Sequence, residues 1–349
     1  MKKLLSSMIC VNLRLICSVL APIFLLFFLL VTANTEASAK TIDLQIQPGL
    51  ENIRPLSKPA RLTLTLRDGA GKAIDRTRFQ IRLYAPPRGL FFSTDFPQVE
   101  GTPLIEIESP AFQGKIEWEY VFPIRGVYRL EVSAVDGVGD RVKQVFPLRI
   151  RESRTKLVYL GTFLAGLFLF ALMVGRLFTP RGRETHIAVG LLWLAGSVLS
   201  IFPAMAQELT TKVPGDKEFL VRLEVSPPTV GQPSEIHWRL SEKETGMPYP
   251  THLTLAITQL EKGKRIFFLK QIPTDGNLAF KFHFVDGSPH RVSSIAELKG
   301  RNPIRVEKVV AVTGIEPPKA VSLRALVLFL GVLVLGLITG RMSHRWKKR

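Results

Sequence analysis

The second half of the chain repeats the order of segments found in the first half. Each half opens with an apolar stretch that ends in Ala-x-Ala, continues through a strand-rich region and closes with another apolar stretch. In the first half these segments are residues 15–39, 40–156 and 157–178, and in the second half they are residues 187–206, 207–320 and 321–340. A chain of this plan is expected to hold two folded domains on one side of a membrane.

The first apolar stretch has the pattern of a secretory signal. Residues 1–39 carry basic residues, then an apolar core, then Ala37-Ser38-Ala39 before Lys40, which predicts a signal peptide cleaved after Ala39 or an N-terminal anchor. The other three apolar stretches are long enough to cross a bilayer as helices. They are residues 157–178, 187–206 and 321–340. The second of them also ends like a signal peptide, so cleavage after Ala206 stays open as well.

The net charge of +18 is concentrated in part beside the apolar stretches. Basic residues next to a span are retained on the cytoplasmic side, so residues 179–186 are predicted to be a cytoplasmic hairpin and residues 341–349 a cytoplasmic tail. Both strand-rich domains are then periplasmic, in a multi-pass protein of a bacterial inner membrane. Within those domains Lys and Arg are interspersed with Asp and Glu, which argues against a nucleic-acid partner.

Cysteine chemistry is not expected in the folded domains. Cys10 and Cys17 are the only cysteines, and both lie in the predicted export segment, residues 1–39. Leu15 and Ile16 before Cys17 are poor matches for lipidation, which prefers a small residue there, so Cys17 is interpreted as an apolar helix residue. The domains therefore contain no disulfide.

Matching segments indicate that the two strand-rich regions are related. The matched pairs are Leu44-x-Ile46-x-Pro48 with Leu223-x-Val225-x-Pro227, Leu90-Phe91-Phe92 with Ile266-Phe267-Phe268, and Gly114-x-Ile116-x-Trp118 with Gly276-x-Leu278-x-Phe280. Residues 98–113 are interpreted as an insertion in the first copy. Shared alternation can arise independently in strands, but these matches occur in one order and favour duplication or fusion of a whole unit.

Alternating apolar and polar residues between turn signals predict all-β domains, each an antiparallel sandwich. The segment from Gly126 through Tyr128 to Gly139 resembles the penultimate strand and hairpin of immunoglobulin-like and fibronectin type III-like domains of bacterial envelope proteins. This resemblance implies two Ig-like sandwiches and a structural role for Tyr128, whose hydroxyl would tie its strand to the preceding turn. His290 stands at the corresponding position of the second copy.

Histidines of the second domain are the main candidates for ligand chemistry. His237, Met247, His252, His283 and His290 would suit a periplasmic copper ion. Strand alternation argues against a shared site, because Phe282 and Phe284 point inward and therefore send His283 outward, whereas His290 aligns with the inward Tyr128. Metal handling stays an alternative, with His283 and His290 as candidate ligands, and ordinary strand histidines are the favoured interpretation.

Three further motifs have two interpretations each. Residues 136–140 (Asp-Gly-Val-Gly-Asp) are a hairpin turn rather than a calcium loop, which needs more oxygen ligands. Leu90, Phe91, Phe92 and Phe96 form either an interaction patch or part of the packing shared by both domains. Gly336 and Gly340 have the spacing of helix-dimer motifs, which also recurs by chance.

The sequence contains no phosphate loop, nucleophile elbow or paired carboxylates, so the chain is predicted not to be an enzyme and to need no cofactor. The expected function is display of two periplasmic Ig-like domains for protein–protein interaction or assembly support. The expected partners are membrane lipid and another envelope or membrane protein.

Overall fold

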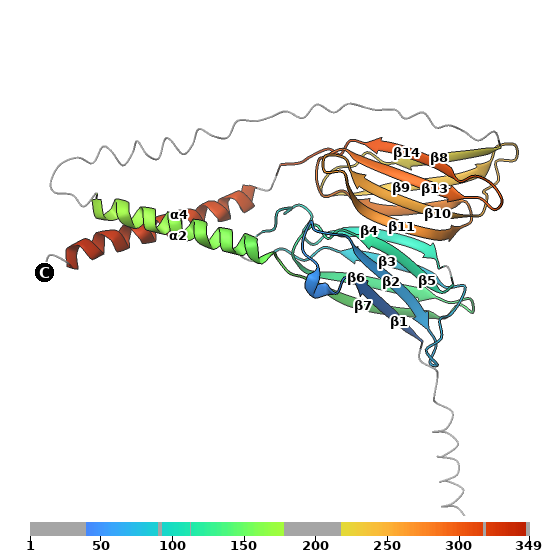
Figure 1. Ribbon diagram of the computed structural model, residues 1–349, viewed down its shortest axis with the longest axis horizontal. Coiled ribbons are helices and arrows are strands. Elements are labelled where there is room, and N and C mark those ends of the chain that lie inside the picture. The colour runs from blue at the N-terminus through green and yellow to red at the C-terminus, as the bar shows by residue number, and fades with distance from the viewer. Residues whose placement is uncertain (1–39, 90–92, 112, 178–217, 317–318, 347–349) are drawn as a thin grey trace, which may run out of the picture.

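The chain folds into a β-sheet head and a pair of long helices. The computed structural model describes residues 40–89, 93–111, 113–177, 218–316 and 319–346 (Figure 1). We call residues 40–153 half 1 and residues 218–316 half 2 of the head. The predicted signal segment, the hairpin 179–186 and the span 187–206 lie outside the described residues.

Each half contributes seven strands. Those of half 1 are β1 (Thr41–Gln47), β2 (Ala60–Arg67), β3 (Arg78–Tyr84), β4 (Pro103–Pro110), β5 (Lys115–Tyr120), β6 (Gly126–Val135) and β7 (Arg141–Ile150), with the 3-10 turn η1 (Leu50–Asn52) after β1. Those of half 2 are β8 (Phe219–Val225), β9 (Pro233–Glu242), β10 (Thr251–Gln259), β11 (Lys264–Thr274), β12 (Asn277–His283), β13 (His290–Glu297) and β14 (Ile304–Val310). The helices are α2 (Arg154–Leu177) and α4 (Lys319–Trp346).

Both halves arrange their strands in the same order. Half 1 has β1-β2-β5 in one sheet and β7-β6-β3-β4 in the other, and half 2 has β8-β9-β12 and β14-β13-β10-β11. The counterpart of β11 is therefore β4, which lies inside residues 98–113. The interpretation of that segment as an insertion is wrong, and so is the match of Leu90-Phe91-Phe92 to residues 266–268, which belong to β11.

The two halves share their sheets instead of forming two separate sandwiches. β5 pairs with β11 and β4 pairs with β12, so each sheet runs through both halves as seven antiparallel strands. Trp118 lies opposite Leu269 in the first junction, and Ile107 lies opposite Phe280 in the second. All four of these side chains are buried in one core that extends through both halves.

Polar contacts cover the outer side of the same junction. Arg265 of β11 pairs with Glu119 of β5 at 2.6 Å, and its guanidinium lies 4.1 Å from the ring centroid of Phe268. Lys281 of β12 lies 3.9 Å from Glu106 of β4. The junction is thus apolar on the inside and charged on the outside, as an ordinary pair of sheet strands is.

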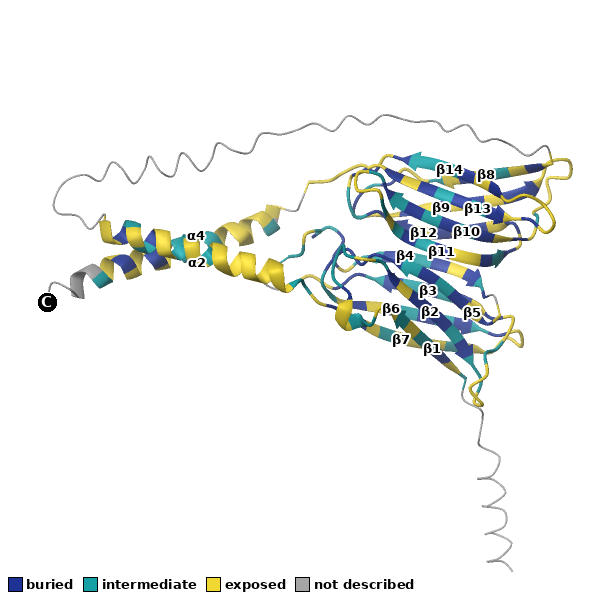
Figure 2. Cartoon of the chain, in the orientation of Figure 1, coloured by how far each residue is buried: buried dark blue, intermediate teal, exposed yellow. Residues whose placement is uncertain are grey.

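The helices leave the head together and expose apolar side chains along almost their whole length (Figure 2). The most apolar 18-residue stretches within Arg154–Leu177 and Val321–Ser343 have mean hydropathy of 2.3 and 2.6, and both helices are long and apolar enough to cross a membrane. The first helix begins three residues before the predicted span 157–178, and the second continues to Trp346 into the predicted tail. Both helices therefore present apolar surfaces to their surroundings.

Small residues bring α2 and α4 into contact. The two helices run in the same direction, with Phe163 against Phe329 and Arg176 Nε donating to Ser343 Oγ at 2.9 Å. A Cβ on Gly340 would lie 2.3 Å from the carbonyl oxygen of Leu172, and one on Gly336 would lie 2.6 Å from the Cβ of Ala171. The Gly336/Gly340 face therefore packs within the chain.

Replacing Gly340 with leucine is expected to separate the two helices, because backbone atoms occupy the space that its side chain needs. Cysteines at positions 163 and 329 report the separation through disulfide yield in membranes. We expect the yield to fall by about tenfold, the effect of losing roughly 1.4 kcal/mol of pairing. Gly331→Leu is the matched control, since nothing lies within 4 Å of its Cβ position. Equal yields in both variants would contradict this packing.

Candidate functional site at the junction of the two halves

A loop of half 1 lies where the helices, half 1 and half 2 meet. We call residues 93–102 the hub loop, and the end of the head where β7 leads into α2 the helix-proximal end. Glu100 is buried and holds the loop together by accepting from Ser93 Oγ at 3.0 Å and from the Thr94 amide at 2.7 Å. Val99 is fully buried beneath it. The loop is thus a fixed part of the head.

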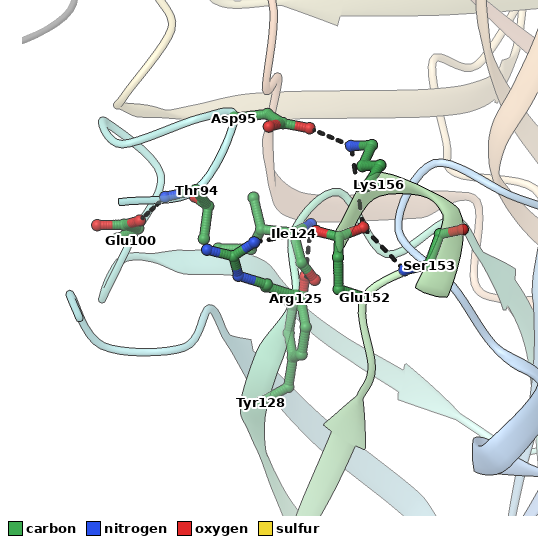
Figure 3. Close-up of polar contacts among 9 residues, drawn as sticks. All are labelled: Thr94, Asp95, Glu100, Ile124, Arg125, Tyr128, Glu152, Ser153 and Lys156. Carbon is green, nitrogen blue, oxygen red and sulfur yellow. Dashed lines mark hydrogen bonds and ion pairs between the residues drawn. The ribbon is translucent and has the colours of Figure 1, made fainter. Parts of the chain in front are cut away.

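The hub loop contacts the first turn of α2 (Figure 3). Asp95 accepts a hydrogen bond from Lys156 Nζ at 2.6 Å. Glu152, just before the helix, lies 3.3 Å from Arg125 and accepts from the Ser153 amide at 3.0 Å. Asp95 and Lys156 are both half-exposed, so this pair contributes about 0–1 kcal/mol and serves to orient the helix more than to stabilise the head.

Tyr128 supports the turn next to this site. Its hydroxyl donates to the Ile124 carbonyl at 2.7 Å and accepts from the Ile124 amide at 2.9 Å. Burial raises the pKa of this phenol well above its usual value, so it stays protonated. The ring lies edge-on to Phe122 at 4.9 Å. Tyr128 thereby ties β6 to the residues before it.

His290 packs against a phenylalanine in half 2 as Tyr128 does in half 1. Its ring lies edge-on to Phe284 at 5.0 Å, and its Nδ1 lies 2.7 Å from the Ser288 carbonyl. No described residue hydrogen-bonds its Nε2. Asp286 Oδ1 is 3.8 Å away and instead accepts from the Ser288 hydroxyl. Burial lowers the pKa of His290, so the side chain is a neutral core residue at ordinary pH.

His283 is fully buried, and the expectation that it points into solvent is wrong. Strand alternation does turn it away from Phe282 and Phe284, but half 1 covers that side. Its Nδ1 lies 3.2 Å from Thr102 Oγ1 and 3.3 Å from the Pro103 carbonyl, both of half 1. Its Nε2 accepts from the Gly231 amide at 3.0 Å. Sequence periodicity predicts which face of its strand a side chain occupies, but not what packs against that face.

The candidate metal ligands do not come together. His283 uses both ring nitrogens in hydrogen bonds. His290 lies on β13 of the other sheet, where its ring packs against Phe284. His237, Met247 and His252 are exposed. Among the described residues no group of three or more His, Cys, Asp or Glu side chains could hold a metal ion.

The Asp136–Asp140 turn holds a lysine. Lys40 Nζ lies 2.5 Å from Asp136 and 2.6 Å from Asp140. Asp136 also accepts from the amides of Val138 and Asp140, which is the bonding of a turn. The hydrogen bond from Lys40 is the main reason that the pKa of Asp136 is lowered. An ammonium thus occupies the place between these carboxylates.

Of the candidate interaction patch, the structure describes only Phe96, because Leu90, Phe91 and Phe92 lie outside the described residues. Phe96 is half-buried and packs against the core from the hub loop. The network around this loop was not found from sequence, since Asp95, Glu100 and Lys156 match no motif and Asp95 lies 61 residues from its partner Lys156.

Two shallow clefts flank the junction at the end of the head far from the helices, where the paired strands diverge. A cleft of about 220 Å³ on one sheet is lined by Glu106, Glu108, Glu235, His237 and Lys281, among others. A cleft of about 260 Å³ on the other sheet is lined by Lys115, Glu117, Lys270 and Gln271, among others. Carboxylates, amines and an imidazole therefore border the places where strand edges are left without a neighbour.

Comparison with known proteins identifies no family for this chain. No protein family matches the sequence, and no curated protein is similar to it. Among solved structures, a conjugative transposon lipoprotein from Bacteroides eggerthii is 16% identical, with 27% of this chain and 98% of that one covered and a TM-score of 0.19. Dimeric latent PorU from Porphyromonas gingivalis is 10% identical, with 80% and 25% covered and a TM-score of 0.25.

A β-glucuronidase from Parabacteroides merdae is 9% identical, with 77% of this chain and 24% of that one covered and a TM-score of 0.18. The chain thus spans about a quarter of the length of PorU and of this enzyme. At TM-scores this low, none of the three similarities informs the function of this chain.

Replacing Tyr128 with phenylalanine is expected to lower the free energy of unfolding of the head by about 1–3 kcal/mol, because the amide and carbonyl of Ile124 lose their partner in a buried place. Chemical denaturation of the purified full chain in detergent measures the change. Tyr84→Phe is the control, since Tyr84 lies on the outer face beneath Arg129. We expect a change below about 0.5 kcal/mol there. Equal losses in both variants would argue against the role of the Tyr128 hydroxyl.

Proposed function

We propose that this chain is a non-enzymatic, multi-span protein of a bacterial inner membrane that presents a β-sandwich head outside the cytoplasm for binding another protein. The observation that carries the proposal is the continuity of the two sheets through both halves of the head. This continuity supports a return crossing of the membrane between the halves, the sandwich fold and the location of the binding surface.

Sheet continuity supports a return crossing between the halves. Helix α2 leads away from half 1 and ends at Leu177, yet half 2 pairs with half 1 through β5–β11 and β4–β12. If α2 crosses a bilayer, residues 178–217 have to cross it again to reach half 2. Residues 187–206 are apolar and, as a helix rising 1.5 Å per residue, would cover about 30 Å, the thickness of the hydrocarbon core.

Basic flanks then favour one orientation. Arg181 and Arg183 would lie between two spans, and residues 345–349 include four basic residues after the last span. Positive residues are retained on the cytoplasmic side, so the head would lie outside, and residues 1–39 would be its export signal. This arrangement brings the head into contact with lipid at its helix-proximal end.

The strand order supports the immunoglobulin-like assignment. Each half has three strands in one sheet and four in the other, and in half 1 a buried tyrosine bonds back to the turn before its strand. The same order in both halves also supports duplication of one unit. Domains of this kind bind through their surfaces and commonly carry no catalytic group.

The ionisable groups support binding rather than catalysis. The described groups with clearly shifted pKa values serve structural contacts, such as Lys40 between two aspartates and the buried Tyr128. The two clefts beside the junction combine charged side chains with strand edges, which suits a protein partner. Metal handling has less support, because His283 and His290 have separate structural partners.

Accessibility of single cysteines tests the membrane arrangement. In a chain whose Cys10 and Cys17 are replaced by serine, Val138→Cys and Met247→Cys place exposed reporters in halves 1 and 2. We expect a membrane-impermeant maleimide to label both once the outer membrane is opened, and to label Lys348→Cys only after the inner membrane is disrupted. Labelling of the two halves from opposite sides would contradict the shared head and the return crossing.

Site-specific photo-cross-linking in living cells tests the binding function. A photoreactive residue at His237, beside the 220 Å³ cleft, is expected to capture one discrete protein. The matched control is Arg149 on β7, at the far edge of the same sheet and exposed. A partner captured at His237 and not at Arg149 supports the proposal. The same products at both positions, or none at His237, would overturn it.

A further inference from the structure

His283 connects the two halves of the head through a single imidazole. On one side its Nδ1 faces Thr102 Oγ1 and the Pro103 carbonyl of half 1, and on the other its Nε2 faces the Gly231 amide of half 2. Its side chain lies outside the apolar core, because the core side chains Phe282 and Phe284 beside it point to the opposite face of the sheet. The ring therefore fills the contact between the hub loop and the residues before β9.

The partners allow one protonation state. The Gly231 amide can only donate, so Nε2 has to carry a lone pair. The Pro103 carbonyl can only accept, so Nδ1 has to carry the proton. Thr102 agrees with this assignment, because its hydroxyl donates to the Val99 carbonyl at 2.7 Å and leaves its oxygen free to accept from Nδ1. The neutral Nδ1–H ring thus satisfies all of these contacts.

A second proton would break the contact with Gly231. It would sit on Nε2 and face the Gly231 N–H, so that a hydrogen bond is replaced by two opposed donors. The contacts of Nδ1–H with half 1 would remain. The protonated ring would also be a fully buried cation, and the loss of hydration disfavours this charged form.

Charged groups of the surrounding elements do not compensate the cation. On the hub loop, Asp95 bonds Lys156 and Glu100 bonds Ser93 and Thr94. On β12, Lys281 lies between Glu106 and Glu235 on the outer face. Residues 228–232 contain no titratable side chain. Among the described residues, no carboxylate lies within 4 Å of His283 as an ion pair, whereas Asp286 does approach His290.

We propose that His283 is an acid-sensitive latch that holds residues 228–232 on β12, closed while its imidazole is neutral and opened by its protonation. Opening breaks the hydrogen bond from the Gly231 amide and loosens residues 228–232, which lie beside Gln98 of the hub loop. The latch thereby links acidity around the head to the packing of this segment against the hub loop, which bonds α2 through Asp95 and Lys156. It stands on the geometry of this contact and does not depend on the proposed partner or on the side of the membrane.

The sign of the pH dependence follows from the burial of the ring. Burial holds the pKa of His283 below its ordinary value of 6.5, so the closed latch binds fewer protons than the open one. The closed state is therefore fully favoured above pH 6.5 and loses its advantage as pH falls below that value. With an open-state pKa of 6.5 and a closed state that stays neutral, the opening equilibrium rises by at most about tenfold between pH 7.5 and pH 5.5.

Hydrogen exchange of the Gly231 amide measures opening directly, because this amide donates a hydrogen bond to His283 in the closed state. The full chain in detergent is compared at pH 7.5, 6.5 and 5.5 by mass spectrometry of peptides covering residues 226–232, corrected for the intrinsic exchange rate. We expect protection in this segment to fall by about tenfold, while the strands of half 1 stay protected. Unchanged protection, or simultaneous loss throughout the head, would overturn the latch.

Two variants separate the latch from a general effect of buried histidines. His283→Gln keeps an acceptor for Gly231 but does not titrate, so its exchange in this segment is expected to be independent of pH. His290→Gln removes the other buried histidine without touching the junction, and the pH dependence at Gly231 is expected to remain. A pH response that survives in His283→Gln, or disappears in His290→Gln, would assign the effect elsewhere. If His283→Gln does not fold, the wild-type and His290→Gln results still decide the question.

Discussion

The pairing of β4 with β12 and of β5 with β11 is the contact on which the rest of the structure depends. Each pair is only a few residues long, yet together they join the two halves into two seven-stranded sheets and let Trp118, Phe267 and Phe280 share one core. Without this pairing each half would be a small sandwich with two more unpaired strand edges and a smaller core. The pairing makes the head one rigid body and brings Thr102 and Gly231 to the two sides of His283.

This contact also constrains how the head sits on its helices. Because the halves cannot separate without breaking both sheets, α2 and α4 leave one body and meet each other through Gly336 and Gly340. The hub loop lies where these constraints converge, bonded to α2 through Asp95 and to half 2 through Thr102. A displacement of either half at this end therefore reaches a helix through hydrogen bonds and not only through the linker.

Sequence periodicity predicted the strands and the two described apolar helices, because both depend on local patterns. It could not predict the junction, since β4, β5, β11 and β12 alternate like every other strand and nothing local marks which edge meets which. The same limit explains the misplaced match of Leu90-Phe91-Phe92 and the burial of His283, which depends on residues of the other half. Tyr128 was singled out through the resemblance of its strand to immunoglobulin-like domains, and its hydroxyl does bond back to Ile124 in the preceding turn.

Joining the halves edge to edge reduces a hazard of all-β proteins. Unpaired strand edges template aggregation, and the two junctions cover the edges of four strands, leaving β1, β7, β8 and β14 outermost. On β7 the edge carries Lys143 and Pro147, and the Gln144 side chain accepts from the Ile42 amide of β1, which bridges the two sheets there. The clefts beside the junction are where covered edges diverge, so they offer strand edges to a partner only over a short length. A head built this way leaves little unpaired strand edge for indiscriminate strand addition.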